Sequence, residues 1–205
     1  MLFILGCSNV KGPLKWALLR ATIFSILLSW GKNFMGLTDF FIDYIPMYNK
    51  FRAVSSILVI AEFTIPLLAI LTLKEILTKP EFLKEKLKYI YISFGLTGGL
   101  ALLFAIAPRL FFPTYIPGNE MAALQNALPA DQLSPIIANL EEMRVHLFPS
   151  DAWRSFFIVT IGTLLLLAYN AKKLKATWTV AAIALLCLGD MWSVNKRYLY
   201  DEQFI

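Results

Sequence analysis

Long runs of apolar residues, separated by short polar segments, dominate the chain. Residues 89–107 and 155–171 contain no charged side chain, and residues 54–73 contain only Glu62. At a rise of ~1.5 Å per helical residue, runs of this length approach the ~30 Å hydrocarbon core of a bilayer. The pattern therefore predicts an all-α fold, a polytopic transmembrane helical bundle.

We expect about five spans, preceded by a partial one at the N-terminus. Their apolar runs are 16–30, 54–73, 89–107, 155–171 and 176–189. The apolar residues before Lys11 are interpreted as the tail of a truncated span. The whole chain, 1–205, is accordingly taken as a single fragment of a transmembrane domain.

Basic residues divide unequally between the loops on the two sides of these spans. One side carries Lys11, Lys15, Arg20, Lys74, Lys79, Lys84, Lys86, Lys88, Lys172, Lys173 and Lys175 within short connections. The other carries Lys32, Lys50, Arg52, Arg109, Arg144, Arg154, Lys196 and Arg197, spread over longer segments. The positive-inside rule predicts that loops 74–88 and 172–175 are cytoplasmic. Loops 31–53 and 108–154 and the C-terminus are then extracytoplasmic. The net charge of +5 reflects this topology and does not indicate nucleic-acid binding.

The two long extracytoplasmic loops contain helical patterns of their own. Phe34, Leu37, Phe41, Tyr44 and Tyr48 recur at helical spacing, and Pro46 should end the regular helix. In the second loop we expect a short helix from Asn119 to Leu128 and another that starts at Ser134-Pro135. The apolar face of the latter is formed by Ile136, Leu140, Met143 and Leu147. Both patterns predict amphipathic helices on the membrane surface or on top of the bundle.

Few residues in the sequence are candidates for catalysis or metal binding. Asp39 and Asp43, one helical turn apart, could hold a divalent metal or supply a general base, or could simply form a solvated face. His146, the only histidine, has no ligand-spaced partner and is interpreted as a packing residue. The chain has no glycine-rich phosphate loop and no nucleophile elbow, so neither ATP-driven nor hydrolase chemistry is supported. No cofactor and no metal site is predicted.

Glu62 is an acid in the middle of an apolar run, where ionisable side chains normally face the bundle interior with a partner. Counted from the cytoplasmic ends of their spans, Arg20 and Glu62 differ in depth by about five residues, or ~7–8 Å, and a long arginine side chain could close much of that gap. We therefore expect either an intramembrane pair between Arg20 and Glu62 or a hydrogen-bonded, protonated Glu62. A substrate or proton-relay role is the alternative.

Basic residues also gather at the predicted extracytoplasmic ends of the spans, beside Trp30 and Trp192. They are Lys32, Lys50, Arg52, Lys196 and Arg197. Such a cluster suits an anionic headgroup or a carrier phosphate, although ordinary interfacial anchoring gives the same pattern.

Two segments resemble a known family. The stretches LLSWGKNF and TDFFIDYIPMYNKFRAVS, with the later GDMWSVNKRYL, are similar to the YfhO family of bacterial membrane proteins, particularly its Bacteroidetes-type members. The resemblance extends over essentially the whole chain. Family members are longer, so this chain is interpreted as an internal or C-proximal piece whose partners include the remainder of its own full-length chain.

The resemblance implies a GT-C-like glycosyltransferase in the bacterial cytoplasmic (inner) membrane. Such an enzyme takes a sugar from a polyprenyl-phosphate-linked donor on the extracytoplasmic side. The family's usual catalytic aspartate lies in a loop that this sequence does not match, so the catalytic residue is unknown. The positions that match the recurring segments are Lys32, Asn33, Arg52, Asp190, Trp192, Lys196 and Arg197. We expect them at the carrier-phosphate or acceptor site. A transporter or flippase-like bundle and a structural membrane scaffold are the alternatives.

Overall fold

A computed structural model describes residues 1–45, 54–79, 82–112, 114–127 and 129–198. Helices account for nearly all of these residues, and no strand occurs among them. The expected all-α fold is thereby confirmed. The chain forms two compact units, Met1–Ser93 and Phe94–Ile205, and each is described by itself.

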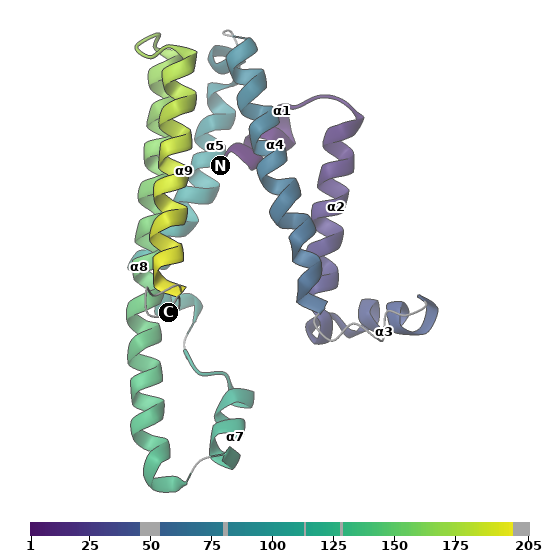
Figure 1. Ribbon diagram of the computed structural model, residues 1–205, viewed down its shortest axis with the longest axis vertical. Coiled ribbons are helices and arrows are strands. Elements are labelled where there is room, and N and C mark those ends of the chain that lie inside the picture. The colour runs from purple at the N-terminus through teal and green to yellow at the C-terminus, as the bar shows by residue number, and fades with distance from the viewer. Residues whose placement is uncertain (46–53, 80–81, 113, 128, 199–205) are drawn as a thin grey trace, which may run out of the picture. The chain divides into compact units, whose positions relative to one another are not determined.

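The first unit consists of short and long helices that pack around one long helix. They are α1 (Leu2–Asn9), α2 (Pro13–Ser29), η1 (Gly31–Phe34), α3 (Met35–Tyr44), η3 (Val54–Ile57) and α4 (Leu58–Thr78), and the unit also includes the first part of α5 (Phe82–Ile106). The central element is α4, which contacts both α1 and α2 (Figure 1). The helix α3 ends one residue before Ile45, in agreement with the predicted stop near Pro46. Its placement at a membrane surface stays a prediction.

Small and hydroxylated residues line the contacts of α4. The hydroxyls of Thr22 on α2 and Thr64 on α4 are hydrogen-bonded at 2.7 Å, and both residues are buried. On α1, Gly6 lies against the Thr72 side chain so closely that a Cβ at this position would overlap it. Small residues let helix backbones approach, and interhelical hydroxyl bonds add to packing in an apolar environment. This seam sets the register between α1, α2 and α4.

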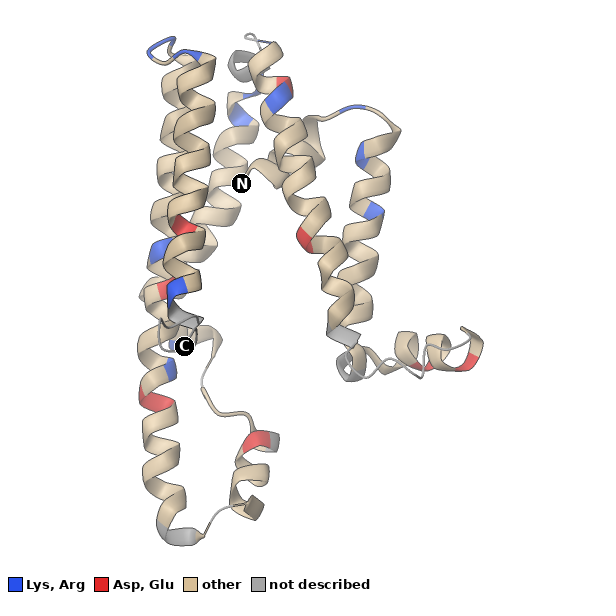
Figure 2. Cartoon of the chain, in the orientation of Figure 1, with Lys and Arg blue, Asp and Glu red and all other residues tan. Residues whose placement is uncertain are grey.

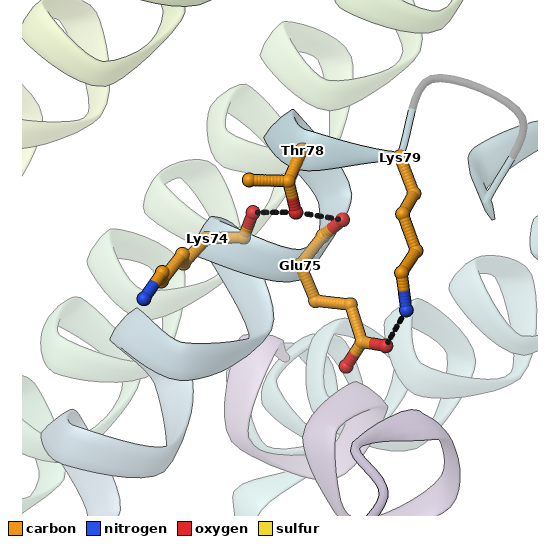
Figure 3. Close-up of polar contacts among 4 residues, drawn as sticks. All are labelled: Lys74, Glu75, Thr78 and Lys79. Atoms are coloured by element: carbon orange, nitrogen blue, oxygen red, sulfur yellow. Dashed lines mark hydrogen bonds and ion pairs between the residues drawn. The ribbon is translucent and has the colours of Figure 1, made fainter.

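A compact set of polar contacts marks the end of α4 (Figure 3). The Thr78 hydroxyl donates to the carbonyls of Lys74 and Glu75 at 2.9 and 3.2 Å. Lys79 Nζ, just beyond the helix, lies 3.0 Å from Glu75 Oε1. The Glu75 carbonyl also accepts the Lys79 amide at 3.1 Å, so the Thr78 hydroxyl adds a second donor to the last turn of the helix. These contacts fall in the loop 74–88 that the sequence predicts to be cytoplasmic.

The second unit is dominated by a helical hairpin. Its elements are the last part of α5 (Phe82–Ile106), then α6 (Pro108–Phe111), α7 (Gly118–Ala127), α8 (Ala130–Asn170) and α9 (Ala176–Tyr198). The helices α8 and α9 run antiparallel and side by side (Figure 1). At the turn between them the Lys173 amide donates to the Ala168 carbonyl and the Lys172 amide to the Tyr169 carbonyl. Lys172 has a positive φ of 58°, the left-handed conformation of a Schellman cap.

Three helical segments are long and apolar enough to cross a membrane, namely Lys86–Ile106, Gln132–Asn170 and Ala176–Lys196. They contain the expected spans 89–107, 155–171 and 176–189 almost entirely. Charged residues are sparse along these helices, and basic residues mark the turn between α8 and α9 (Figure 2). The chain is therefore a membrane-embedded protein.

The other two expected spans, 16–30 and 54–73, correspond to α2 and α4. With 17 residues, α2 is about 26 Å long, slightly less than the ~30 Å hydrocarbon core. The 21-residue α4 contains Glu62, Lys74 and Glu75, which interrupt its apolar character. The total of five spans stays a prediction.

The loop 108–154 differs most from expectation. Its short helix, expected over 119–128, is α7 at Gly118–Ala127. The next helix was expected to start at Ser134, but α8 starts at Ala130 and continues through Pro135 and Pro149 to Asn170. The predicted amphipathic segment and the span after it are thus one helix of 41 residues. A proline removes one backbone donor, yet neighbouring turns can continue the helix around it.

Candidate functional site

A charged cluster joins the two helices of the α8–α9 hairpin. Arg154 Nε on α8 lies 3.4 Å from Asp190 Oδ1 on α9, and Arg154 Nη1 lies 4.0 Å from Asp151 Oδ1 one turn away. The side chains of Arg154 and Asp190 retain 29% and 30% of their exposure. One guanidinium thus contacts carboxylates on both helices.

The depth of this cluster follows from helix geometry. Arg154 lies 16 residues before Asn170, the end of α8, or about 24 Å along the helix. Asp190 lies 14 residues after Ala176, or about 21 Å. The cluster is therefore near the end of the apolar spans, opposite the lysine-rich turn. Charges at this level are screened less than in water, so their mutual attraction is correspondingly stronger.

The cluster has spare hydrogen-bonding capacity. Arg154 Nε and Nη1 and Asp190 Oδ1 are buried atoms without a hydrogen-bond partner in the described structure. The 3.4 Å separation brings the charges together without a well-formed hydrogen bond. These atoms are shielded from solvent, so a polar group or a water molecule could bind to them only after neighbouring side chains move.

Two further residues of the predicted site lie on another face of α9. Lys196 Nζ is 5.9 Å from the ring centroid of Trp192, within the range of a cation–π contact. Trp192 is 69% exposed. Because Asp190 contacts α8 while Trp192 is exposed, the segment 190–196 presents an ion pair toward its neighbour and an aromatic–cation pair outward.

The remaining residues of the predicted site are only partly described. Arg52 lies outside the described residues, as does Lys50. Lys32 and Asn33 belong to η1 in the first unit, and Arg197 belongs to the last turn of α9 in the second. Their convergence on one phosphate stays a prediction.

Arg20 and Glu62 do not form an ion pair in the part of the chain that the structure describes, and both side chains are exposed. The Thr22–Thr64 bond sets the register of the antiparallel α2 and α4. It places Arg20 at the level of Pro66, four residues or about 6 Å from Glu62 along the axis. The intramembrane pair stays a prediction that requires both side chains to reach across this gap.

The other candidate residues lie on α3 and in the first half of α8. Asp39 and Asp43 on α3 are both exposed, and so is His146 on α8. Among the described residues, no group of three or more histidine, cysteine, aspartate or glutamate side chains is arranged to hold a metal ion.

A second ion pair anchors α7 to α8. Arg144 donates to both carboxylate oxygens of Glu120, at 2.7 and 2.8 Å, and to the Tyr115 carbonyl at 2.8 Å. The hydrogen bond with Arg144 is the main reason that the pKa of Glu120 lies below its usual value. This bidentate pair fixes the position of the short helix on the long one.

Neither the pair of Arg154 with Asp190 nor that of Arg144 with Glu120 was predicted from the sequence. The length of the connection between α8 and α9 could have indicated the first pair. The connection 172–175 is short, so residues at equal distances before and after it must face each other in an antiparallel hairpin. Counting outward from residues 172 and 175 places Arg154 opposite Ser193, within one helical turn of Asp190. The second pair depends on how residues 112–129 fold back, and the sequence pattern does not define that path.

Comparisons with family models, with curated proteins and with solved structures find no match to this chain.

Proposed function

We propose that this chain forms part of the membrane domain of a GT-C-like glycosyltransferase resembling the YfhO family. The enzyme would use a polyprenyl-phosphate-linked sugar on the extracytoplasmic side of the bacterial cytoplasmic membrane. One observation carries the proposal. The segment 190–197, which also carries the resemblance, stands at the end of the α8–α9 hairpin opposite the lysine-rich turn.

The chemistry of this segment suits an anionic lipid carrier. Lysine and arginine bind phosphate oxygens through charge-assisted hydrogen bonds, and Lys196 and Arg197 are close to the apolar–polar boundary where a carrier phosphate would lie. The exposed Trp192 offers an aromatic face at the same level, where indole rings prefer to be. We assign these residues to binding and no residue to catalysis.

The proposal is tested by sugar transfer in membranes that contain the complete protein. Radiolabelled sugar on a polyprenyl-phosphate donor is supplied, and Lys196→Ala and Arg52→Ala are compared with the unmodified protein. Loss of one phosphate contact should raise the KM for the donor about tenfold, the effect of removing a charged hydrogen bond of about 1.5 kcal/mol. Lys173→Ala in the opposite turn is the matched control and should leave KM unchanged. Unaltered transfer by both test variants would remove the phosphate-site assignment.

A transporter or flippase is the second candidate, and Glu62 is the observation that favours it. This carboxylate is exposed on α4 within a largely apolar helix, where an acid is expensive unless it has a function or a partner. Glu62→Gln should then abolish substrate movement across proteoliposomes at unchanged protein content. Unchanged movement in this variant would exclude a role of Glu62 in transport.

A further inference from the structure

A small groove lies within the second unit, between the last two turns of α5 and the middle of α8. Its volume is about 230 Å³. The described residues that line it are Ala101, Phe104, Phe148, Asp151, Ala152 and Ser155. Both helices contain membrane-spanning segments.

The groove lies at one surface of the bilayer. Phe104 is 18 residues, about 27 Å, from Lys86 at the start of the α5 span. Asp151 is 19 residues, about 29 Å, from Asn170 at the end of the α8 span. Both distances match the ~30 Å hydrocarbon thickness. The groove is therefore level with lipid headgroups, on the side opposite the lysine-rich turn.

Its walls combine aromatic rings with one carboxylate. The Phe104 and Phe148 ring centroids are 5.9 Å apart, and Phe112 packs on the Phe148 ring at 5.1 Å. The faces of phenyl rings attract cations. Asp151 is the one charged side chain among the described lining residues, and Ser155 adds a hydroxyl acceptor. Ala101 and Ala152 complete the lining with small side chains that leave room beside the rings.

The contact between Asp151 and Arg154 is compatible with a ligand in the groove. Arg154 approaches Asp151 Oδ1 at 4.0 Å from within α8 and is not one of the lining residues described. A carboxylate has two oxygens and about four lone-pair sites, so it can accept from a guanidinium and from a second donor together. Arg154 would hold Asp151 in place for that second donor.

We propose that the groove binds the primary ammonium headgroup of a phosphatidylethanolamine-type lipid in the leaflet at this surface. A primary ammonium offers three N–H donors to Asp151 and Ser155, whereas a quaternary ammonium offers none. The volume is below the ~300–1,000 Å³ of pockets that enclose drug-sized ligands, so it suits a headgroup amine. The inference rests on the membrane-spanning helices and is independent of sugar transfer.

Lipid retention measured by native mass spectrometry tests this assignment. The full chain in detergent micelles is titrated with short-chain phosphatidylethanolamine, phosphatidylcholine and phosphatidylglycerol. We expect phosphatidylethanolamine to be retained about tenfold more tightly than the other two, the effect of one charged hydrogen bond. Asp151→Asn should abolish this preference. Equal retention of the three lipids, or a preference that survives Asp151→Asn, would overturn the proposal.

A second variant and a control guard against misfolding. Ala152→Leu fills the groove without changing any charge, and it should lower phosphatidylethanolamine retention while circular dichroism shows an unchanged helix content. Glu142→Gln removes an exposed carboxylate of the same helix and should leave retention as it is. Displacement of the lipid by equimolar free ethanolamine would assign the groove to a soluble amine and overturn the lipid assignment.

Discussion

The Arg154 guanidinium on α8 and the Asp190 carboxylate on α9 lie 3.4 Å apart, near the end of the hairpin that their helices form. The turn at residues 171–175 fixes one end of this hairpin, and the ion pair fixes the register at the other. Most of the side chains between the turn and the ion pair are apolar, and they could pack in several alignments of the two helices. The ion pair favours one of these alignments.

Arg154→Gln should lower the stability of the second unit. The substitution leaves Asp190 and Asp151 without their shared cation in a partly apolar environment. Loss of one partner of a fully buried pair costs about 3–5 kcal/mol, and the residual exposure of both groups reduces this to roughly 1–2 kcal/mol. Thermal unfolding in detergent measures the change.

Two variants complete this test. Arg109→Gln removes an exposed arginine of α6 and should change the unfolding midpoint little. The exchange Arg154→Asp with Asp190→Arg should recover part of the loss, because it restores opposite charges across the hairpin. Equal midpoints for Arg154→Gln and Arg109→Gln would show that the pair does not stabilise the hairpin.

Gly6→Ala should destabilise the contact of α1 with α4. The added Cβ would overlap Thr72 Oγ1 and lie 3.1 Å from Leu68 Cγ, both in a buried contact. Overpacking of this kind costs about 1–3 kcal/mol. Thr72→Ala in the same chain removes the overlapping atom and should recover part of the loss in a double-mutant cycle of unfolding midpoints.

Gly36→Ala is the control for this substitution. Nothing lies within 4 Å of a Cβ at Gly36 on α3, so the change should be neutral or slightly stabilising. If Gly6→Ala had the same small effect, the close approach of α1 to α4 would be refuted.

Acid should release α7 from α8. The pKa of Glu120 is lowered mainly by its hydrogen bond with Arg144, so ionised Glu120 stabilises the docked α7. This contribution is complete above the ordinary pKa of 4.5 and is lost as the pH falls through the lower, folded-state value. The protection factors of the α7 amides, which correct for the intrinsic slowing of exchange in acid, should fall across that interval. In Glu120→Gln the acid-dependent step should be absent, whereas Glu142→Gln should retain it.

Lys172→Gly should stabilise the turn between α8 and α9. Lys172 takes a left-handed conformation, which costs a residue with a Cβ roughly 1–2 kcal/mol and glycine almost nothing. Part of this gain is offset by the greater freedom of glycine in the unfolded chain, so we expect a net gain of about 0.5–1 kcal/mol. Lys173→Gly, one residue along, should give no gain. A lower unfolding midpoint for Lys172→Gly would contradict this explanation.

The apolar pattern predicted the all-helical fold and three of the spans. Runs such as 89–107 and 176–189 are long enough to cross the bilayer, and a segment that crosses it must form a helix to pair its backbone groups. The pattern missed the continuity of α8. Pro149 and the polar residues before it look like a boundary, but a helix can continue around a proline when the turns on both sides remain hydrogen-bonded.

The candidate site was predictable only in part. Asp190, Trp192 and Lys196 were identified because they lie in the segment that resembles the family. The residues that they contact depend on the register of α9 against α8. The short turn aligns α8 with α9 to within about one helical turn, which brings Arg154 near Asp190, and the ion pair then fixes the exact register. The distance between Glu62 and Arg20 depends on the Thr22–Thr64 contact, which two of many buried hydroxyl residues form and which no periodicity singles out.

The length of α8 has a mechanical consequence. At about 60 Å it is twice the hydrocarbon thickness, so its first 20 residues extend about 30 Å beyond its apolar half. A tilt of ~20° within the bilayer, typical of such helices, displaces the far end sideways by roughly 10 Å. Because Arg144 clamps Glu120, α7 travels with it. The position of α7 is thus tied geometrically to the tilt of the apolar half of α8.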